Sequence, residues 1–89
     1  MKIVVNREFG GFSLPETFCK KYGFSAYDDI DRTDDRLVRF IENNGGEVEV
    51  FCGTLEVAEI PDESTDWELN DYDGMESIIY VVDGKIHWA

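Results

Sequence analysis

Basic residues are missing from most of the second half of this 89-residue chain. Residues 40–84 contain thirteen Asp and Glu and no Lys or Arg, whereas residues 1–39 contain seven acids and seven bases. The formal net charge of −12 therefore arises entirely in the second half. Nucleic acids and anionic membranes bind basic surfaces, so the composition argues against both as direct partners. It permits a basic protein as partner, although acidity also serves solubility.

The density of these acids is close to that of DNA. Duplex DNA carries one charge per ~1.7 Å of its axis, so thirteen charges correspond to about 22 Å of duplex. A compact domain of this length is about 30 Å across. The sequence leaves open whether the acids share one face, because strand alternation and loops both place some of them. The candidate partner-binding residues are Glu47, Glu49, Glu56, Glu59, Asp62, Glu63, Asp66, Glu68, Asp71 and Asp73.

Long apolar runs are also missing. None approaches the ~18 residues of a membrane span, and the apolar stretch in "MKIVVNRE" is too short for a signal-peptide core. We therefore expect a cytosolic protein whose two cysteines, Cys19 and Cys52, are free thiols. The length predicts a single domain over residues 1–89.

The chain has one histidine, His87, and no Ser or Cys at a spacing that implies a nucleophile–histidine pair. Its carboxylates are numerous, but nothing in their spacing implies the pairing of a catalytic dyad. We therefore expect no enzymatic activity and no required cofactor. Zinc is kept as an alternative, because Cys19, Cys52 and His87 can meet across one sheet face with an Asp or Glu as fourth ligand. No C-x-x-C or H-x-x-x-H spacing supports it, and the competing interpretation is two small thiols and a strand histidine beside Tyr80.

Two adjacent glycines, Gly10 and Gly11, stand in "REFGGFSLPE". Their spacing fits neither a Walker loop nor a dinucleotide-binding loop. We predict instead a tight turn between a strand and a helix, with Phe9 and Phe12 packing into the core. Ser13 and Glu16 have the spacing of a capping box, which would make Ser13 the N-cap residue of the helix.

The remaining chain predicts helices first and strands afterwards. One helix ends at Gly23, and a second, capped by Asp31 or Thr33, carries an apolar stripe of Leu37, Phe40 and Ile41 and stops at "NNGG". This order favours an α+β domain, a small antiparallel sheet of four to five strands with two short helices packed on one face. Segments with the pattern of a strand are 2–5, 47–52, 55–60, 75–82 and the end of the chain from 85, and 66–69 is a candidate for a short edge strand.

The dipeptide Asp83-Gly84 is the clearest hairpin signal in the chain. A two-residue turn there fixes the register of its strands. It predicts four facing pairs: Val82 with Lys85, Val81 with Ile86, Tyr80 with His87, and Ile79 with Trp88.

Several segments resemble a family of small phage and prophage proteins, most of them of unknown function. Members open with K-I-V-[IV]-N-R, an aromatic residue, G-G-F and a polar helix start, as in "KIVVNREFGGFSLPE". Later they carry a V-E-I-P-D segment and an aromatic-led strand before Y-D-G-x-E, which resemble "VAEIPDE", "DWEL" and "YDGMESI". The resemblance covers about half of the chain and ends before the hairpin "YVVDGKIHWA".

The resemblance implies a phage-encoded protein that acts in the cytoplasm of the bacterial host cell. Small acidic phage proteins that are not enzymes often resemble inhibitors of host defence, including anti-CRISPR proteins that occupy the basic nucleic-acid channels of a nuclease. We therefore expect an inhibitor that mimics DNA and binds a basic host protein, specifically a type II RNA-guided nuclease. The alternatives are a phage accessory or regulatory protein with no defence role, and a zinc-stabilised interaction module. The oligomeric state is left open.

Overall fold

The computed structural model describes residues 1–89 and confirms the α+β class. It contains six strands rather than four to five, arranged in two three-stranded antiparallel sheets with the orders β1-β3-β2 and β4-β5-β6. Neither helix has the length and apolarity that crossing a membrane requires. The elements are β1 (Lys2–Asn6), α1 (Glu16–Tyr22), α2 (Asp35–Asn43), β2 (Glu47–Val50), β3 (Gly53–Glu59), β4 (Asp66–Tyr72), β5 (Met75–Val82) and β6 (Lys85–Trp88).

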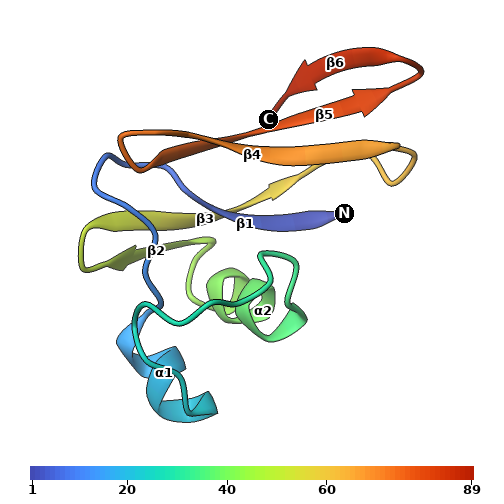
Figure 1. The fold of residues 1–89 in the computed structure, drawn as a ribbon. Helices are drawn as coiled ribbons and strands as arrows, with labels where there is room; N and C mark the ends of the chain where they lie inside the picture. Colours follow the sequence, from blue (N-terminus) through green and yellow to red (C-terminus); the bar gives the residue numbers. More distant parts are fainter.

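The molecule has three layers, with the first sheet (β1-β3-β2) between the helices and the second sheet (β4-β5-β6) (Figure 1). Strand β1 explains why a single sheet does not suffice. Val4 packs with Phe18 of α1 in the core below the sheet, whereas Ile3 and Val5 pack with Ile78 of β5 in a second core above it. Helices on one face alone would leave Ile3 and Val5 in water, so the apolar run of β1 requires a second covering layer.

Helix α1 begins two residues later than the capping-box motif predicts. Pro15 is its N-cap residue, and the Ser13 hydroxyl makes no hydrogen bond. The Leu14 amide donates to the Ala26 carbonyl at 2.7 Å, which ties this segment to the connector between the helices instead of the first helical turn. The predicted end is confirmed, because Gly23 adopts a left-handed conformation with φ 78°.

Helix α2 is capped by Asp34, not by Asp31 or Thr33. The Asp34 side chain accepts a hydrogen bond from the Arg36 amide at 2.9 Å, and the Arg36 guanidinium beside it lowers the pKa of the Asp34 carboxyl. The predicted stripe is confirmed: Leu37 and Ile41 are buried, with Phe40 packed against their core.

Both Asp-Gly dipeptides of the second sheet form two-residue hairpin turns. The β5–β6 register is confirmed at all four predicted pairs, from Val82–Lys85 to Ile79–Trp88. The turn predicted over "NDYDG" is shorter in the structure. Strand β4 continues to Tyr72, and only Asp73 and Gly74, both with positive φ, form the turn. Cys52 was expected to end a strand, but it lies in the turn between β2 and β3.

The glycine pair forms the corner after β1, as predicted, and this corner packs on the β4–β5 turn. The Gly10 amide donates to the Asp73 carbonyl at 2.9 Å. A Cβ on Gly74 would lie 2.4 Å from the Gly11 nitrogen, so only glycine fits there. The prediction that Phe9 packs into the core is wrong: it is exposed and meets the ring of Tyr72 edge to face. Phe12, as expected, packs against the core.

A mostly buried ion pair joins the layers. The Arg32 guanidinium, in the connector between the helices, donates to both carboxylate oxygens of Glu76 on β5, at 2.6 and 2.9 Å. The same carboxylate accepts the Asn6 amide at 2.8 Å, and the Arg32 carbonyl accepts the Val4 amide at 2.7 Å. These bonds give the amides of Val4 and Asn6 partners on the edge of β1 that no strand pairs with.

Candidate functional site

The predicted partner-binding acids are at the surface, but they do not share one face. All are exposed except Glu56, which is half-buried. They fall into three groups along the chain. Glu47, Glu49 and Glu56 lie on β2 and β3; Glu59, Asp62 and Glu63 lie around the β3–β4 connection; and Asp66, Glu68, Asp71 and Asp73 lie on β4 and its turn.

Four of these carboxylates have partners within the chain, and the simplest case is Asp66, which accepts the amide of its neighbour Trp67 at 2.9 Å. Glu56 accepts the Arg7 Nε–H at 3.3 Å. Asp62 lies 2.6 Å from the Met1 ammonium, which lowers the pKa of the Asp62 carboxyl. Asp71 accepts the Gly74 amide at 2.7 Å and so supports the hairpin turn. These four acids therefore contribute to local structure as well as to the surface charge.

The second sheet has one face toward the first sheet and one toward solvent. Trp67, Leu69 and Ile78 lie on the inner face, in the core shared with β1. Because directly paired residues point to the same side, the register of β4, β5 and β6 defines the opposite side. We call it the outer face: Asp66, Glu68, Asn70 and Tyr72 of β4; Met75, Ser77, Ile79 and Val81 of β5; and Ile86 and Trp88 of β6.

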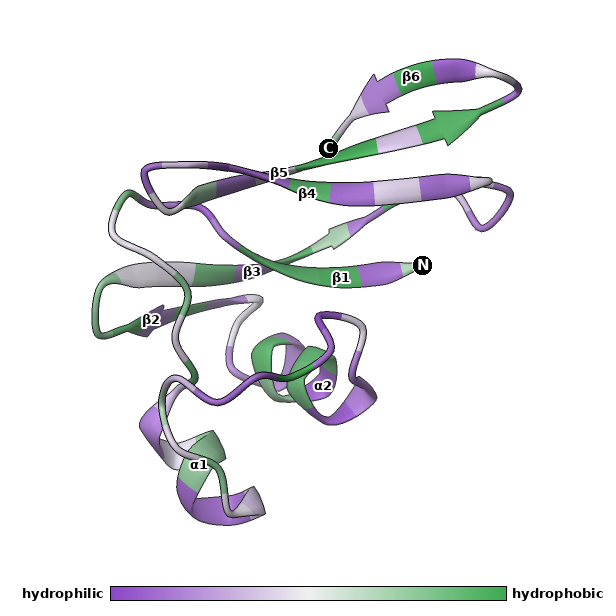
Figure 2. Cartoon of the chain, viewed as in Figure 1, coloured by the Kyte–Doolittle hydropathy of each residue, from purple (hydrophilic) through white to green (hydrophobic).

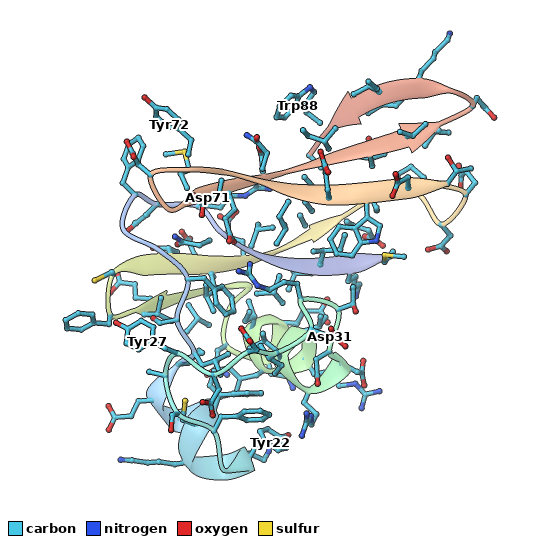
Figure 3. All side chains as sticks on the ribbon, viewed as in Figure 1. Tyr22, Tyr27, Asp31, Asp71, Tyr72 and Trp88 are labelled. Atoms are coloured by element: carbon cyan, nitrogen blue, oxygen red, sulfur yellow. The ribbon has the colours of Figure 1, made fainter.

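The outer face exposes large apolar side chains. Ile86 is 68 % exposed and Trp88 is 61 % exposed. Figure 2 shows hydrophobic colour along much of β5 and in the middle of β6, and Figure 3 shows Tyr72 and Trp88 on the side of the sheet away from β1. Contiguous exposed apolar surface of this kind marks interaction sites. Trp and Tyr are also the residues that most often anchor protein interfaces.

Acids border this apolar surface along β4. Asp66 pairs with Val81, which pairs with Ile86, and Glu68 pairs with Ile79, which pairs with Trp88. Each row across the sheet thus runs from a carboxylate on β4 to an exposed apolar residue on β6. Of the predicted acids, only Asp66 and Glu68 lie in these rows.

The apolar pattern of β5 in the sequence already indicated an exposed apolar face, although the charge pattern directed the prediction to the acids. In "SIIYVV" apolar residues occupy both alternating sets of β5, and the predicted hairpin register already placed Ile79 beside Trp88 and Val81 beside Ile86. One of these sets has to face solvent unless a further layer covers it. Only the structure shows which set lies outside.

The structure does not bring the candidate zinc ligands together. Cys19 is on α1, Cys52 is in the β2–β3 turn and His87 is on β6, where its ring stacks on Tyr80. No group of three His, Cys, Asp or Glu side chains is arranged to hold a metal ion. Burial and the nearby Asp28 raise the pKa of the Cys19 thiol. The zinc-stabilised module stays a prediction, which elemental analysis of the purified protein tests.

No protein-family model, curated protein or solved structure matches the chain. The fold and the outer face define the molecule as a small α+β protein that presents a mixed apolar and acidic sheet face. Its activity is a matter for proposal.

Proposed function

We propose that the protein is a phage-encoded inhibitor that binds a basic, nucleic-acid-handling surface of a host defence nuclease through its outer face. A type II RNA-guided nuclease is the particular target. The observation that carries the proposal is the outer face itself, where exposed Ile86 and Trp88 lie in the same rows as Asp66 and Glu68. The resemblance to phage proteins supplies the setting.

The two kinds of residue on this face have different functions in binding. Trp88, Ile86 and Tyr72 supply apolar area and rigid rings, which account for most of the affinity in typical interfaces. Asp66 and Glu68 sit at the border, where charges set orientation and association rate more than affinity. The acids elsewhere on the surface add to the long-range attraction toward a basic channel. A channel that holds nucleic acid offers a partner of the required sign.

The test measures cleavage of target DNA by a guide-loaded type II nuclease in the presence of the protein. Because the proposed surface competes with DNA for the nuclease, we expect inhibition when the protein is added before DNA. We expect much weaker inhibition when the protein is added after DNA. It is also expected to weaken as salt rises. The double variant Asp66→Lys/Glu68→Lys and the variant Trp88→Ala should each lose at least tenfold in inhibitory potency, because both remove interface contacts.

The matched control is Asp29→Lys/Asp31→Lys. These two acids are exposed in the connector between the helices. Figure 3 shows Asp31 on the far side of the first sheet from the outer face. The control makes the same change in net charge and should retain most of the inhibition. Equal losses in both double variants would show that only total charge matters. Unchanged potency in the outer-face variants would exclude this face as the contact.

A phage accessory or regulatory role is the rival proposal. It predicts that the wild-type protein inhibits no defence nuclease, while affinity capture from the host still recovers a partner whose binding depends on Trp88.

A further inference from the structure

A pocket on the opposite side of the molecule, distinct from the outer face, contains an unused hydroxyl. Ser13 is only 1 % exposed, and its Oγ makes no hydrogen bond to any group of the protein. Its expected role as helix cap is not taken, because α1 begins at Glu16. Burying an unpaired hydroxyl costs free energy, so such groups in native proteins usually have a purpose.

Ser13 is one of the residues that line this pocket, which has a volume of about 700 Å³. The pocket lies between α1, the connector between the helices and the end of β2. Leu14, Ala26 and Val50 give it apolar walls. Backbone hydrogen bonds hold these walls in place: Leu14 N–H to the Ala26 carbonyl at 2.7 Å, and Cys19 N–H to the Pro15 carbonyl at 3.0 Å. The pocket is therefore formed before any ligand arrives.

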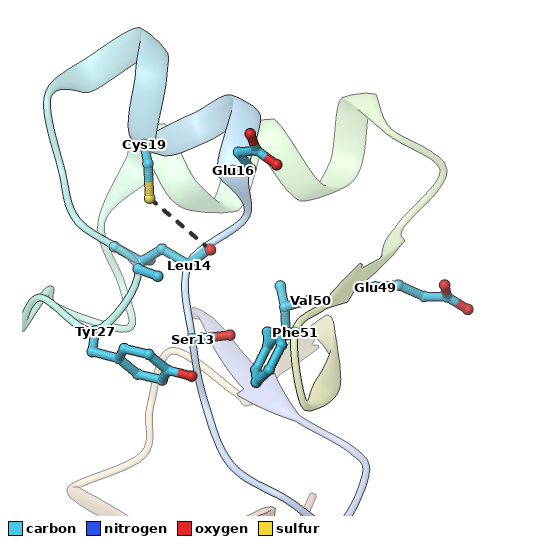
Figure 4. Close-up of a pocket in the computed structure, with 9 residues that line it drawn as sticks. Ser13, Leu14, Glu16, Cys19, Tyr27, Glu49, Val50 and Phe51 are labelled. Atoms are coloured by element: carbon cyan, nitrogen blue, oxygen red, sulfur yellow. Dashed lines mark hydrogen bonds between the residues drawn. The ribbon is translucent and has the colours of Figure 1, made fainter.

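Two exposed aromatic rings stand at the pocket. Tyr27 is 72 % exposed and Phe51 is 84 % exposed, which leaves a face of each ring available. In Figure 4 the two rings lie on either side of Ser13, whose hydroxyl points toward Phe51. Neither ring stacks on another aromatic residue or holds a cation of its own chain, unlike Tyr22 and Phe24, which have Arg36 beside them.

The charge around the pocket selects a cation. No Lys or Arg lines it, whereas Glu16 and Glu49 do. Glu16 pairs with Lys20 at 3.1 Å, but both side chains are highly exposed, so this pair is weak and can be exchanged. The Glu49 carboxylate points away from the pocket and adds only its longer-range field (Figure 4). An anionic ligand would meet carboxylates without any compensating base.

We propose that this pocket binds an arginine side chain of a protein partner. The planar guanidinium can stack on Tyr27 or Phe51, donate to the Ser13 Oγ and pair with Glu16, while the aliphatic stem packs on Leu14 and Val50. Lysine has no planar group to stack and fewer donors in fixed directions. The inference rests on the proposed function only for the source of the arginine, because a basic nuclease surface would supply it.

The test uses the protein alone and a small probe, so its result does not depend on any nuclease. Acetyl-arginine methylamide is titrated into ¹⁵N-labelled protein, with the citrulline analogue as an uncharged probe of the same shape. Saturable shifts are expected at the amides of Ser13, Ala26, Tyr27 and Phe51. The citrulline probe is expected to bind about tenfold more weakly, because it lacks the charge-assisted hydrogen bonds.

Ser13→Ala and Phe51→Ala should each weaken arginine binding about threefold to tenfold. Tyr72→Ala removes another exposed aromatic ring, from the second sheet, and should leave arginine binding unchanged. Ser13→Ala should not lower the melting temperature, because it removes an unpaired buried hydroxyl. A marked destabilisation would instead assign the hydroxyl to the fold and overturn the proposal. Equal binding of the citrulline and arginine probes would also overturn the proposal. The same holds if the shifts at the amides of the pocket residues do not saturate.

Protection of Cys19 gives a second readout, because its thiol belongs to the same pocket. In a Cys52→Ser background, the arginine probe should slow alkylation of Cys19 at least twofold at saturation, and an unchanged rate would contradict binding there. If the probe binds but no nuclease is inhibited, the pocket stands and the proposed function fails. If inhibition is found but the probe does not bind, the reverse holds.

Discussion

At the scale of single residues, the Arg32–Glu76 ion pair is the contact whose loss should cost most. Its side chains are largely buried, and Arg32 also lies over the ring of Phe12, 3.5 Å from its centre. Removing one partner leaves the other charge buried and unpaired, which typically costs about 3–5 kcal/mol. We expect Arg32→Ala to lower the free energy of unfolding by about that amount, measured by urea denaturation.

Arg39→Ala provides the matched control, because it removes another guanidinium from a carboxylate. Both side chains of the Arg39–Asp35 pair are 73 % exposed, and pairs of this kind on helices contribute about 0.3–0.5 kcal/mol. Similar losses in the two variants would mean that burial does not determine the effect of Arg32.

Asp34 gives a prediction about pH. Its pKa is lowered in the folded state, chiefly by hydrogen bonds from Arg36, so its charge stabilises the fold above the unfolded pKa of about 3.9. That contribution is lost as the pH falls through the folded pKa. Asp34→Asn keeps a side chain that caps the helix but removes the charge. We expect it to be less stable than wild type at pH 7, with the difference shrinking below about pH 4, measured as urea midpoints across this range.

At the scale of elements, docking of the β1–α1 corner on the β4–β5 turn can be tested with two equivalent glycines. Gly74 and Gly84 each follow Asp in a two-residue turn, with φ 88° and 73°. An alanine at Gly84 meets nothing and pays only for the left-handed backbone, about 1–2 kcal/mol. At Gly74 it would also collide with the backbone of Gly10 and Gly11. We expect Gly74→Ala to be clearly the more destabilising in thermal unfolding, whereas equal losses would mean that the corner moves aside at little cost.

The sequence predicted elements best where the signal is local. The Asp83-Gly84 turn fixed its own register, and the glycine after α1 ended that helix, because each needs only its neighbours in the chain. The predicted helix starts were wrong where a contact with another segment decided the local structure. The Leu14 amide donates to the Ala26 carbonyl, and Ser13 therefore does not cap a helix. Local patterns also could not predict the division into two sheets, because the alternation of apolar residues along a strand does not show which other element packs on each apolar face.

The candidate site shows the same limit. The acids were correctly placed at the surface, but their grouping depends on strand register and on partners such as Arg7 and the Met1 ammonium, which lie far away in sequence. The outer face and the Ser13 pocket each combine segments that only folding brings together. A charge count therefore predicts the sign of a partner and leaves its contact surface open.

At the scale of the whole molecule, the net charge of −12 should destabilise the fold through repulsion among the carboxylates, as well as attract a basic partner. The acids are spread over several faces, so this repulsion is general, but two cross-strand pairs of acids concentrate it. In the pair Asp71–Glu76, the buried Arg32 offsets the charge of Glu76. The other pair has only the longer 3.3 Å contact of Arg7 with Glu56 to offset it. Glu47 on β2 faces Glu56 on β3 directly, and like charges in that position destabilise a sheet. Such acids would be retained for binding or solubility at some expense of stability.

Glu47→Lys is therefore expected to stabilise the fold, by about 0.2–1 kcal/mol, because it replaces a repulsive cross-strand pair by an attractive one. Glu49→Lys makes the same change in net charge opposite Thr54, so it should gain less. Melting temperatures of both variants at low salt and at 0.5 M salt measure the difference, which should shrink with screening. The same two variants also test whether long-range attraction guides binding. If it does, both should associate with a basic partner more slowly than wild type. Because neither variant is expected to be destabilised, a slower association rate would not come from misfolding. Equal gains in stability would show that general repulsion, and not the Glu47–Glu56 pair, limits the fold.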